Sequence, residues 1–190
     1  MMKNLRIPKY LKTEVGAAIA LGSLGLFAVA AYAATTVILG VGALEDSETF
    51  GGPQTVTMRT ISFAPAEVGA WHYHPGPLFN VVTQGTVTVE DGCGGERSYT
   101  PGQAFEEGGR VHRPKNLGAE PTFAYQTFVV PEGNPTTVNI PGNQRACGPP
   151  RNYNECKHGG WQMFNHPQTF ENQGQCILFV VRQKFASLEH

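Results

Sequence analysis

Short stretches rich in Val, Thr, Ile and Phe, separated by turns that contain Gly or Pro, fill residues 54–130. β-Branched and aromatic residues favour strands, whereas Gly and Pro interrupt them. Several short strands at this spacing are typical of a β-sandwich or barrel, so we predict an all-β fold. The predicted strands cover residues 54–63, 68–74, 79–83, 86–90 and 123–130, with one more through residues 111–112 and a hairpin turn at 91–95.

Size and composition agree with a single turn-rich β domain. The chain has 190 residues, 23 Gly and 14 Pro, and only 15% of its residues are charged, against roughly 25% in an average soluble domain. Without residues 1–14, which hold four basic residues and one acidic residue, the formal net charge falls from −1 to −4. Such a charge makes nucleic acid an unfavourable partner.

The N-terminal region has the charge pattern of an exported protein. Four basic residues between positions 3 and 12 precede residues 15–44, which contain no charged side chain. Two interpretations stay open: a secretory signal peptide with a cleavage site at residues 31–33, or an uncleaved transmembrane anchor. A buried core helix is a poorer explanation because the segment has no polar stripe. Either open interpretation makes the rest of the chain extracytoplasmic, whether secreted or held at the outer face of the cytoplasmic membrane.

The four cysteines are expected to form disulfides, because an exported protein meets an oxidising environment. Sequence alone allows three pairings. We favour Cys156 with Cys176, which closes a short loop, and hence Cys93 with Cys147. A metal-thiolate site is the alternative, but the sequence lacks the C-x-x-C spacing that would support it.

These features give a provisional division of the chain. The last three residues resemble the start of a purification tag. We expect a strand at residues 177–181 to end a C-terminal extension that is otherwise loop held by disulfides. The predicted segments are a signal peptide or membrane anchor (1–44), a linker (45–52), a β-barrel (53–140), the disulfide-held extension (141–187) and a possible tag remnant (188–190).

Three histidines are the candidate metal ligands. His72 and His74 are two residues apart in a predicted strand, so their side chains point to the same side. His112 lies 38 residues beyond His74 and can join them only if a distant strand lies alongside. Neutral imidazoles bind Zn, Fe, Cu and Ni, so we expect one divalent transition metal and the sequence does not choose among these four.

The segments around these histidines resemble the two motifs of the cupin superfamily. G-A-W-H-Y-H-P-G-P-L-F-N-V-V-T-Q-G (69–85) keeps the H-x-H pair and the closing Gly85 of the first motif. R-V-H-R-P-K-N and its preceding glycine (109–116) keep the Gly, His and Asn of the second motif. The sequence departs from the first motif at Leu78, which stands where the family has a glutamate ligand, and from the second at Glu107, which replaces a proline. The resemblance covers about residues 53–131.

The resemblance implies a double-stranded β-helix, or jelly roll, like that of the small exported metallocupins of bacteria. It implies that His72, His74 and His112 converge inside the barrel. With Leu78 in place of the glutamate, the charge of a bound ion would lack a protein counter-charge, and the site would favour anions. We interpret Glu106 and Glu107 as solvated loop charges; the alternative is that one of them restores the carboxylate.

Other residues near the motifs have candidate roles in contacting a ligand or supporting the site. If residue 78 points inward, Asn80 and Gln84 do so too, and Asn80 is the best candidate for a fourth ligand. Trp71 and Phe105 are better explained as packing residues than as a substrate platform. Asn116 is expected to brace the loop after His112 through backbone hydrogen bonds.

The sequence leaves three functions open. The leading hypothesis is an exported or membrane-tethered metal-binding cupin that binds a small anionic or oxygen-rich ligand. The first alternative is a dioxygenase-like enzyme with mononuclear Fe or Cu, because some cupin dioxygenases use three histidines. The second is a structural accessory subunit of a membrane protein complex, attached through residues 15–44, with a vestigial metal site.

Overall fold

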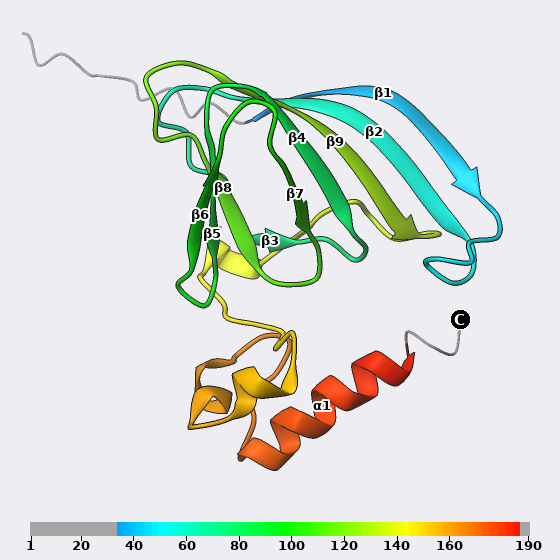
Figure 1. Cartoon of the computed structure of the whole chain (residues 1–190), viewed down its shortest axis with the longest axis vertical. Helices are drawn as coiled ribbons and strands as arrows, with labels where there is room; N and C mark the ends of the chain where they lie inside the picture. Colours follow the sequence, from blue (N-terminus) through cyan, green and yellow to red (C-terminus); the bar gives the residue numbers. More distant parts are fainter. Residues whose placement is uncertain (1–33, 187–190) are drawn as a thin grey trace, which may run out of the picture. The chain divides into compact units, whose positions relative to one another are not determined.

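A computed structural model describes residues 34–186, in which two antiparallel β-sheets are followed by a mainly helical extension (Figure 1). The sheets have the strand orders β1-β2-β9-β4-β7 and β10-β3-β8-β5-β6. The strands are β1 (Thr35–Leu44), β2 (Gln54–Phe63), β3 (His72–Tyr73), β4 (Leu78–Gln84), β5 (Val87–Asp91), β6 (Glu96–Tyr99), β7 (Ala104–Glu107), β8 (His112–Lys115), β9 (Thr122–Pro131) and β10 (Val138–Asn139). The helical segments are the 3₁₀ turns η1 (Pro141–Asn143), η2 (Tyr153–Cys156) and η3 (Gly160–Met163), and the α-helix α1 (Gln173–Ala186).

The period-two pattern of the sequence determines which side chains enter the barrel. In β4, Leu78, Asn80 and Val82 are buried while the residues between them are exposed. β9 continues this layer from the neighbouring strand, with Gln126 and Phe128 buried on the same face. The inner face of the first sheet therefore carries both apolar and polar side chains.

β1 corrects the predicted extent of the N-terminal apolar segment. Residues 35–44 form a strand that pairs with β2 along its whole length, from Thr35 opposite Ser62 to Leu44 opposite Gln54. The last ten residues of the uncharged run are thus an edge strand rich in β-branched residues. The barrel thus starts at residue 35 rather than 53, and the predicted signal or anchor can concern only the chain before it. That chain, like the possible tag at 188–190, lies outside the described residues.

The predicted linker at residues 45–52 is instead the connection of the β1–β2 hairpin. Ser47 is buried in it; its side chain accepts a hydrogen bond from the Phe50 amide, and its carbonyl accepts one from the Gly51 amide. A hairpin connection belongs to the barrel and does not separate two parts of the chain. Within residues 34–186, no helix is long and apolar enough to cross a membrane.

The C-terminal extension contains the helix α1 where we expected a strand at residues 177–181. The Asn172 side chain accepts a hydrogen bond from the Gln175 amide at the start of this helix, as a capping residue does. Cys176 and Val180 lie one helical turn apart and are both buried. Helical spacing lets both side chains pack into one apolar cluster of the extension. This packing outweighs the strand preference of the Ile-Leu-Phe-Val-Val run.

Both disulfides have the pairing favoured from the sequence. Cys156–Cys176 links η2 to α1 inside the extension, and Cys93–Cys147 links the β5–β6 turn to the extension. The sulfur atoms belong to an apolar cluster rather than to a thiolate site, and no free cysteine occurs among the described residues. The other buried members of that cluster are Phe164, Phe170 and Val180.

Candidate metal centre

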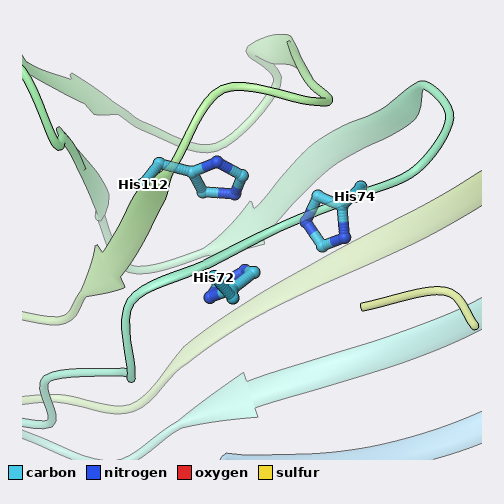
Figure 2. Close-up of side chains that lie close together, drawn as sticks. All are labelled: His72, His74 and His112. Atoms are coloured by element: carbon cyan, nitrogen blue, oxygen red, sulfur yellow. The ribbon is translucent and has the colours of Figure 1, made fainter. Parts of the chain in front are cut away.

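Strand pairing brings the three predicted metal ligands together. His72 in β3 lies directly opposite His112 in β8, and His74 follows just beyond the end of β3. Figure 2 shows the three rings turned toward a common point from these two segments. Ring centroids are 4.6–5.1 Å apart, and one candidate ligand atom from each ring lies within 4.8 Å of the others.

The turn after His74 depends on a glycine. A Cβ atom at Gly76 would collide with the main-chain carbonyl of Val129 in β9. The flanking prolines restrict the backbone on both sides, and the His74 amide donates to the carbonyl of Gly108. The Pro-Gly-Pro sequence thus keeps His74 against the barrel wall.

Main-chain carbonyl groups orient all three rings in the same way. In each ring, Nδ1 lies 2.7 Å from a carbonyl oxygen. The oxygens belong to Ala70 for His72, Thr136 for His74 and Arg110 for His112. Because a carbonyl only accepts, each Nδ1 carries the proton, which leaves Nε2 of the neutral ring with a free lone pair. This is the arrangement expected of metal-binding histidines.

Two of these Nε2 atoms are buried without a hydrogen-bond donor to satisfy them. Within the described part of the chain, nothing donates to Nε2 of His74 or His112, and His112 Nε2 has only the carboxylate of Glu107 beside it. Burial is the main cause that lowers the pKa of His72 to about 4 and that of His74 to about 3, so both rings are neutral at pH 7. Buried, neutral and unsatisfied nitrogens that converge fit a metal ion.

Glu107 supplies a carboxylate at the edge of this cluster. It ends β7 directly opposite Leu78 of β4, so the two side chains share one face of the sheet. Only 8% of its side chain is exposed, and its Oε1 lies 3.1 Å from His112 Nε2. Our interpretation of Glu107 as a solvated loop charge is therefore wrong, whereas Glu106 is exposed as expected. Position 78 in β4 carries no carboxylate, but Glu107 supplies one from the neighbouring strand β7.

Glu107 and His112 shift each other's protonation in opposite directions. Burial alone would raise the pKa of Glu107, but the three histidines, His112 foremost, together hold that pKa well below its usual range. Burial alone would lower the pKa of His112, but the Glu107 charge raises it. Without a metal, each of the two groups thus stabilises the charged form of the other.

A chain of hydrogen bonds connects Glu107 to a cation across the first sheet. Asn80 Nδ2 donates to Glu107 Oε2 at 3.0 Å, and Gln126 Nε2 donates to Asn80 Oδ1 at 2.8 Å. Arg59 Nε in turn donates to Gln126 Oε1 at 2.7 Å. The donor-only guanidinium at one end and the acceptor-only carboxylate at the other determine which way both amides point. The oxygen of Asn80 is thus already used, and Asn80 is not positioned as the fourth ligand we expected.

Sequence reasoning overlooked Arg59 and Gln126, although a signal was present. Each stands on the inward face of its strand next to a buried apolar residue of the same face, Ile61 beyond Arg59 and Phe128 beyond Gln126. Gln84, which we expected to face inward with Asn80, is instead exposed. A shift in the β4–β9 register between Val82 and Gln84 breaks the alternation on which that expectation rested.

The remaining predicted residues have supporting positions. Trp71 is buried against Val111 and Ala146, so it packs in the core. The side-chain nitrogen of Asn116 donates to three main-chain carbonyls and its oxygen accepts from the Gly118 amide, which braces the loop after β8. Phe105 lines the cavity described next and stacks on Tyr99 with ring centroids 4.1 Å apart.

A cavity of about 410 Å³ lies beside the histidines. This volume is in the range that holds small molecules. The polar part of its wall includes His72, His74, Asn80, Glu107 and Gln126, while Ile61 and Phe63 contribute to an apolar part. The barrel thus combines a three-histidine group suitable for a metal ion with room for a ligand next to it.

Comparisons with known proteins agree with this architecture. A family model described as a cupin domain matches residues 59–131. A search of curated proteins gives no match.

Solved structures similar to this chain include three at low sequence identity. A cupin superfamily protein from Desulfitobacterium hafniense DCB-2 is 15% identical over 50% of this chain and 78% of that one, with a TM-score of 0.36. A conserved protein with a double-stranded β-helix domain from Klebsiella pneumoniae subsp. pneumoniae MGH 78578 is 22% identical over 52% and 81%, with a TM-score of 0.38. The cupin domain of an XRE family transcriptional regulator from Enterobacter cloacae is 18% identical over 52% and 97%, with a TM-score of 0.39.

The family match falls on the strands that carry the histidine cluster and the hydrogen-bonded row of Arg59, Gln126, Asn80 and Glu107, which we call the polar row. Residues 59–131 therefore match the cupin domain.

Proposed function

We propose that the protein binds one divalent transition metal through Nε2 of His72, His74 and His112, and that the metal holds a small anionic or oxygen-rich ligand in the adjacent cavity. The observation that carries the proposal is the common orientation of the three rings, each with Nδ1 on a main-chain carbonyl. Such rings can offer Nε2 only to a metal or to a hydrogen-bond donor.

Glu107 is the fourth protein group in reach of that ion. Its distance of 3.1 Å from His112 Nε2 is compatible with two neighbouring ligands of one metal, each about 2.1 Å from it. Three nitrogens and one oxygen suit Zn, Fe, Cu or Ni. The expectation that the ion's charge lacks a protein counter-charge is thus replaced by a site with one carboxylate beside it.

Metal analysis of the purified chain tests the proposal. We expect one equivalent of a transition metal per chain, removable by chelation and restored on adding the ion. A chain that retains and rebinds no stoichiometric metal, at any pH where it is folded, would refute the proposal.

A dioxygenase-like reaction is the second candidate, favoured by the open cavity beside the cluster. A bound Fe or Cu would supply the redox chemistry, while the cavity wall would orient a substrate. Metal identity separates the candidates: native Zn together with no oxygen uptake in the presence of diketones, phenols or thiols would defeat the enzyme. A purely structural accessory role is less well supported, because such a role requires no ligand cavity.

Export of the protein is part of the proposal. The basic residues before an apolar run and the presence of two disulfides both support an oxidising, extracytoplasmic location. The mass of the mature chain tests it: a cleaved signal removes about the first 33 residues, whereas an anchor leaves them in place and directs the chain to the membrane fraction. A full-length chain in the cytoplasmic fraction with reduced cysteines would contradict export.

A further inference from the structure

A single guanidinium group faces the cavity beside the metal centre. Among the described residues that line it, Arg59 is the only Lys or Arg. It lies on the inward face of β2, directly opposite Gln126 of β9. A partly buried cation in the wall of a ligand cavity, with no carboxylate in direct contact, needs an explanation, since burying a charge is costly unless it is paired.

Its contacts hold the guanidinium in place and leave its outer nitrogens free. Nε donates to Gln126 Oε1 at 2.7 Å, and the guanidinium carbon lies 4.4 Å from the centroid of the Phe128 ring. Within residues 34–186, its two terminal nitrogens make no hydrogen bond and no carboxylate lies within ion-pair distance of them. Burial lowers the pKa of Arg59, but a guanidinium remains charged at neutral pH.

Arg59 and the metal centre flank the same aromatic ring. The His74 ring centroid lies 5.4 Å from that of Phe128, whose side chain is fully buried. The guanidinium also lines the same cavity as His72 and His74. One ligand can reach both.

The charges that line the cavity specify the charge of that ligand. A divalent metal and Arg59 together bring three positive charges, and the carboxylates Glu67 and Glu107 bring two negative ones. Three neutral histidines add none. The balance is one positive charge, which a monoanion neutralises.

The rest of the wall accommodates an apolar body. Ile61, Phe63 and Ala124 form a buried apolar cluster that begins one inward position along from the Arg59–Gln126 pair. Val87, Phe105 and Pro114 contribute further apolar surface to the same cavity. The polar row and the apolar cluster therefore divide the cavity into a charged end and an apolar end.

We propose that the ligand is a small monocarboxylate with an apolar body, held at its carboxylate by the free terminal nitrogens of Arg59 while its other polar atom meets the metal. The planar fork of a guanidinium matches a carboxylate in two parallel hydrogen bonds. Gln126 and Phe128 pre-orient this fork. The inference rests on the proposed function, because it requires the metal at the histidines.

Binding of mandelate, which has a hydroxyl besides its carboxylate, and of its neutral isostere mandelamide to the Zn-loaded chain tests the inference by calorimetry. We expect the wild-type chain to bind mandelate at least about tenfold more tightly than mandelamide, since only the anion satisfies Arg59. In Arg59→Gln, mandelate affinity should fall at least about tenfold and the preference for the anion should vanish. Arg59→Lys should retain part of it. Arg182→Gln, which removes the same charge from the exposed surface of α1, should change neither affinity.

The Zn content of each protein distinguishes a failure of the proposed metal site from a failure of the role proposed for Arg59. A wild-type chain that takes up no stoichiometric transition metal, Zn included, refutes the proposed function itself. A Zn-loaded chain that binds the acid and the amide equally well, or a Zn-loaded Arg59→Gln that still prefers the acid, overturns the role of Arg59. If Arg59→Gln does not fold, the comparison of acid with amide in the wild-type chain and in Arg59→Lys still decides.

Discussion

The barrel and the C-terminal extension are stabilised by different means. The barrel consists of paired strands, and its chemistry sits where strand register places it: His72 opposite His112, and Leu78 opposite Glu107. The extension has one long helix, short 3₁₀ turns and an apolar cluster built around disulfides. Strand pairing thus determines the geometry of the site in the barrel, whereas disulfides hold the extension together and make it a support.

The two regions meet at Arg110, which ties the support to the site. Its side chain donates to Glu155 of η2 and to Asp91 at the end of β5, while its carbonyl accepts from Nδ1 of His112. The Val111 amide donates to the carbonyl of Gly148 in the extension. The extension therefore helps to orient one candidate metal ligand without belonging to the candidate metal centre.

The largest expected effect concerns the metal centre alone. His74→Gln removes one of three nitrogens and should weaken metal binding by more than about 100-fold, beyond the 10–100-fold typical of losing a supporting hydrogen bond. His158→Gln, at an exposed position in the extension, is the matched control and should bind metal like the wild type. Competition with a colorimetric chelator measures both. Equal metal affinity in the two variants would show that the cluster is not the binding site.

Removing the disulfide within the extension should separate the stabilities of the two regions. The pair Cys156→Ser and Cys176→Ser opens a link across 20 residues, worth about 3 kcal/mol by loop-closure entropy. We expect amides of α1 to exchange hydrogen much faster while those of β2 and β9 remain protected. Hydrogen exchange with mass spectrometry distinguishes this from uniform loss of protection, which would show that the barrel and extension unfold as one unit.

Acid should destabilise the metal-free barrel through two of its histidines. The lowered pKa values of His72 and His74 mean that, between about pH 4.5 and 6, the unfolded chain binds protons that the folded chain does not. Stability therefore falls as pH falls, with a slope approaching about 2.7 kcal/mol per pH unit for two such groups. His112, whose pKa is raised, is protonated in both states over this window.

Urea unfolding in the presence of a chelator measures that slope. His74→Gln should reduce it by about half, because one of the two groups is gone. A slope unchanged by His74→Gln would contradict the burial of a neutral His74.

The sequence predicted the parts of this molecule that depend on local pattern. The alternation of Val, Thr and Ile gave β2 its observed bounds, and the H-x-H pair placed two ligands on one face. Which strands become neighbours is a non-local property, so the proximity of Glu107 to position 78 was not visible in either motif. The same limitation hid the row formed by Arg59 and Gln126, whose partners lie on other strands.

Local pattern was also misleading where tertiary contacts decide the structure. Residues 35–44 were grouped with an apolar membrane segment because they lack charge, yet their pairing with β2 makes them a sheet edge. The strand expected at residues 177–181 has strand-forming composition, yet the buried spacing of Cys176 and Val180 favours a helix. In both cases the partner, rather than the segment, determined the structure.

A smaller effect on metal affinity is expected when the carboxylate of Glu107 is removed. Glu107→Gln keeps the shape of the side chain and its contact with Asn80 but removes the charge beside His112. We expect metal affinity to fall about 10–100-fold, as for other groups that support or complete a metal site. Glu106→Gln, the exposed neighbour, is the control and should have no effect. If both variants bind metal like the wild type, the carboxylate takes no part in the site.

The smallest expected effect tests the connection between the two regions. Glu155→Gln weakens the hold on the Arg110 side chain, while the Arg110 carbonyl that orients His112 remains. We expect metal affinity to decrease less than about tenfold, below the range for a group that bonds a ligand directly. Glu171→Gln, at an exposed position before α1, removes the same charge from the extension away from Arg110. Chelator competition on both variants decides: only a loss confined to Glu155→Gln shows that the extension supports the metal centre through Arg110, and equal affinities show that the barrel orients its ligands alone.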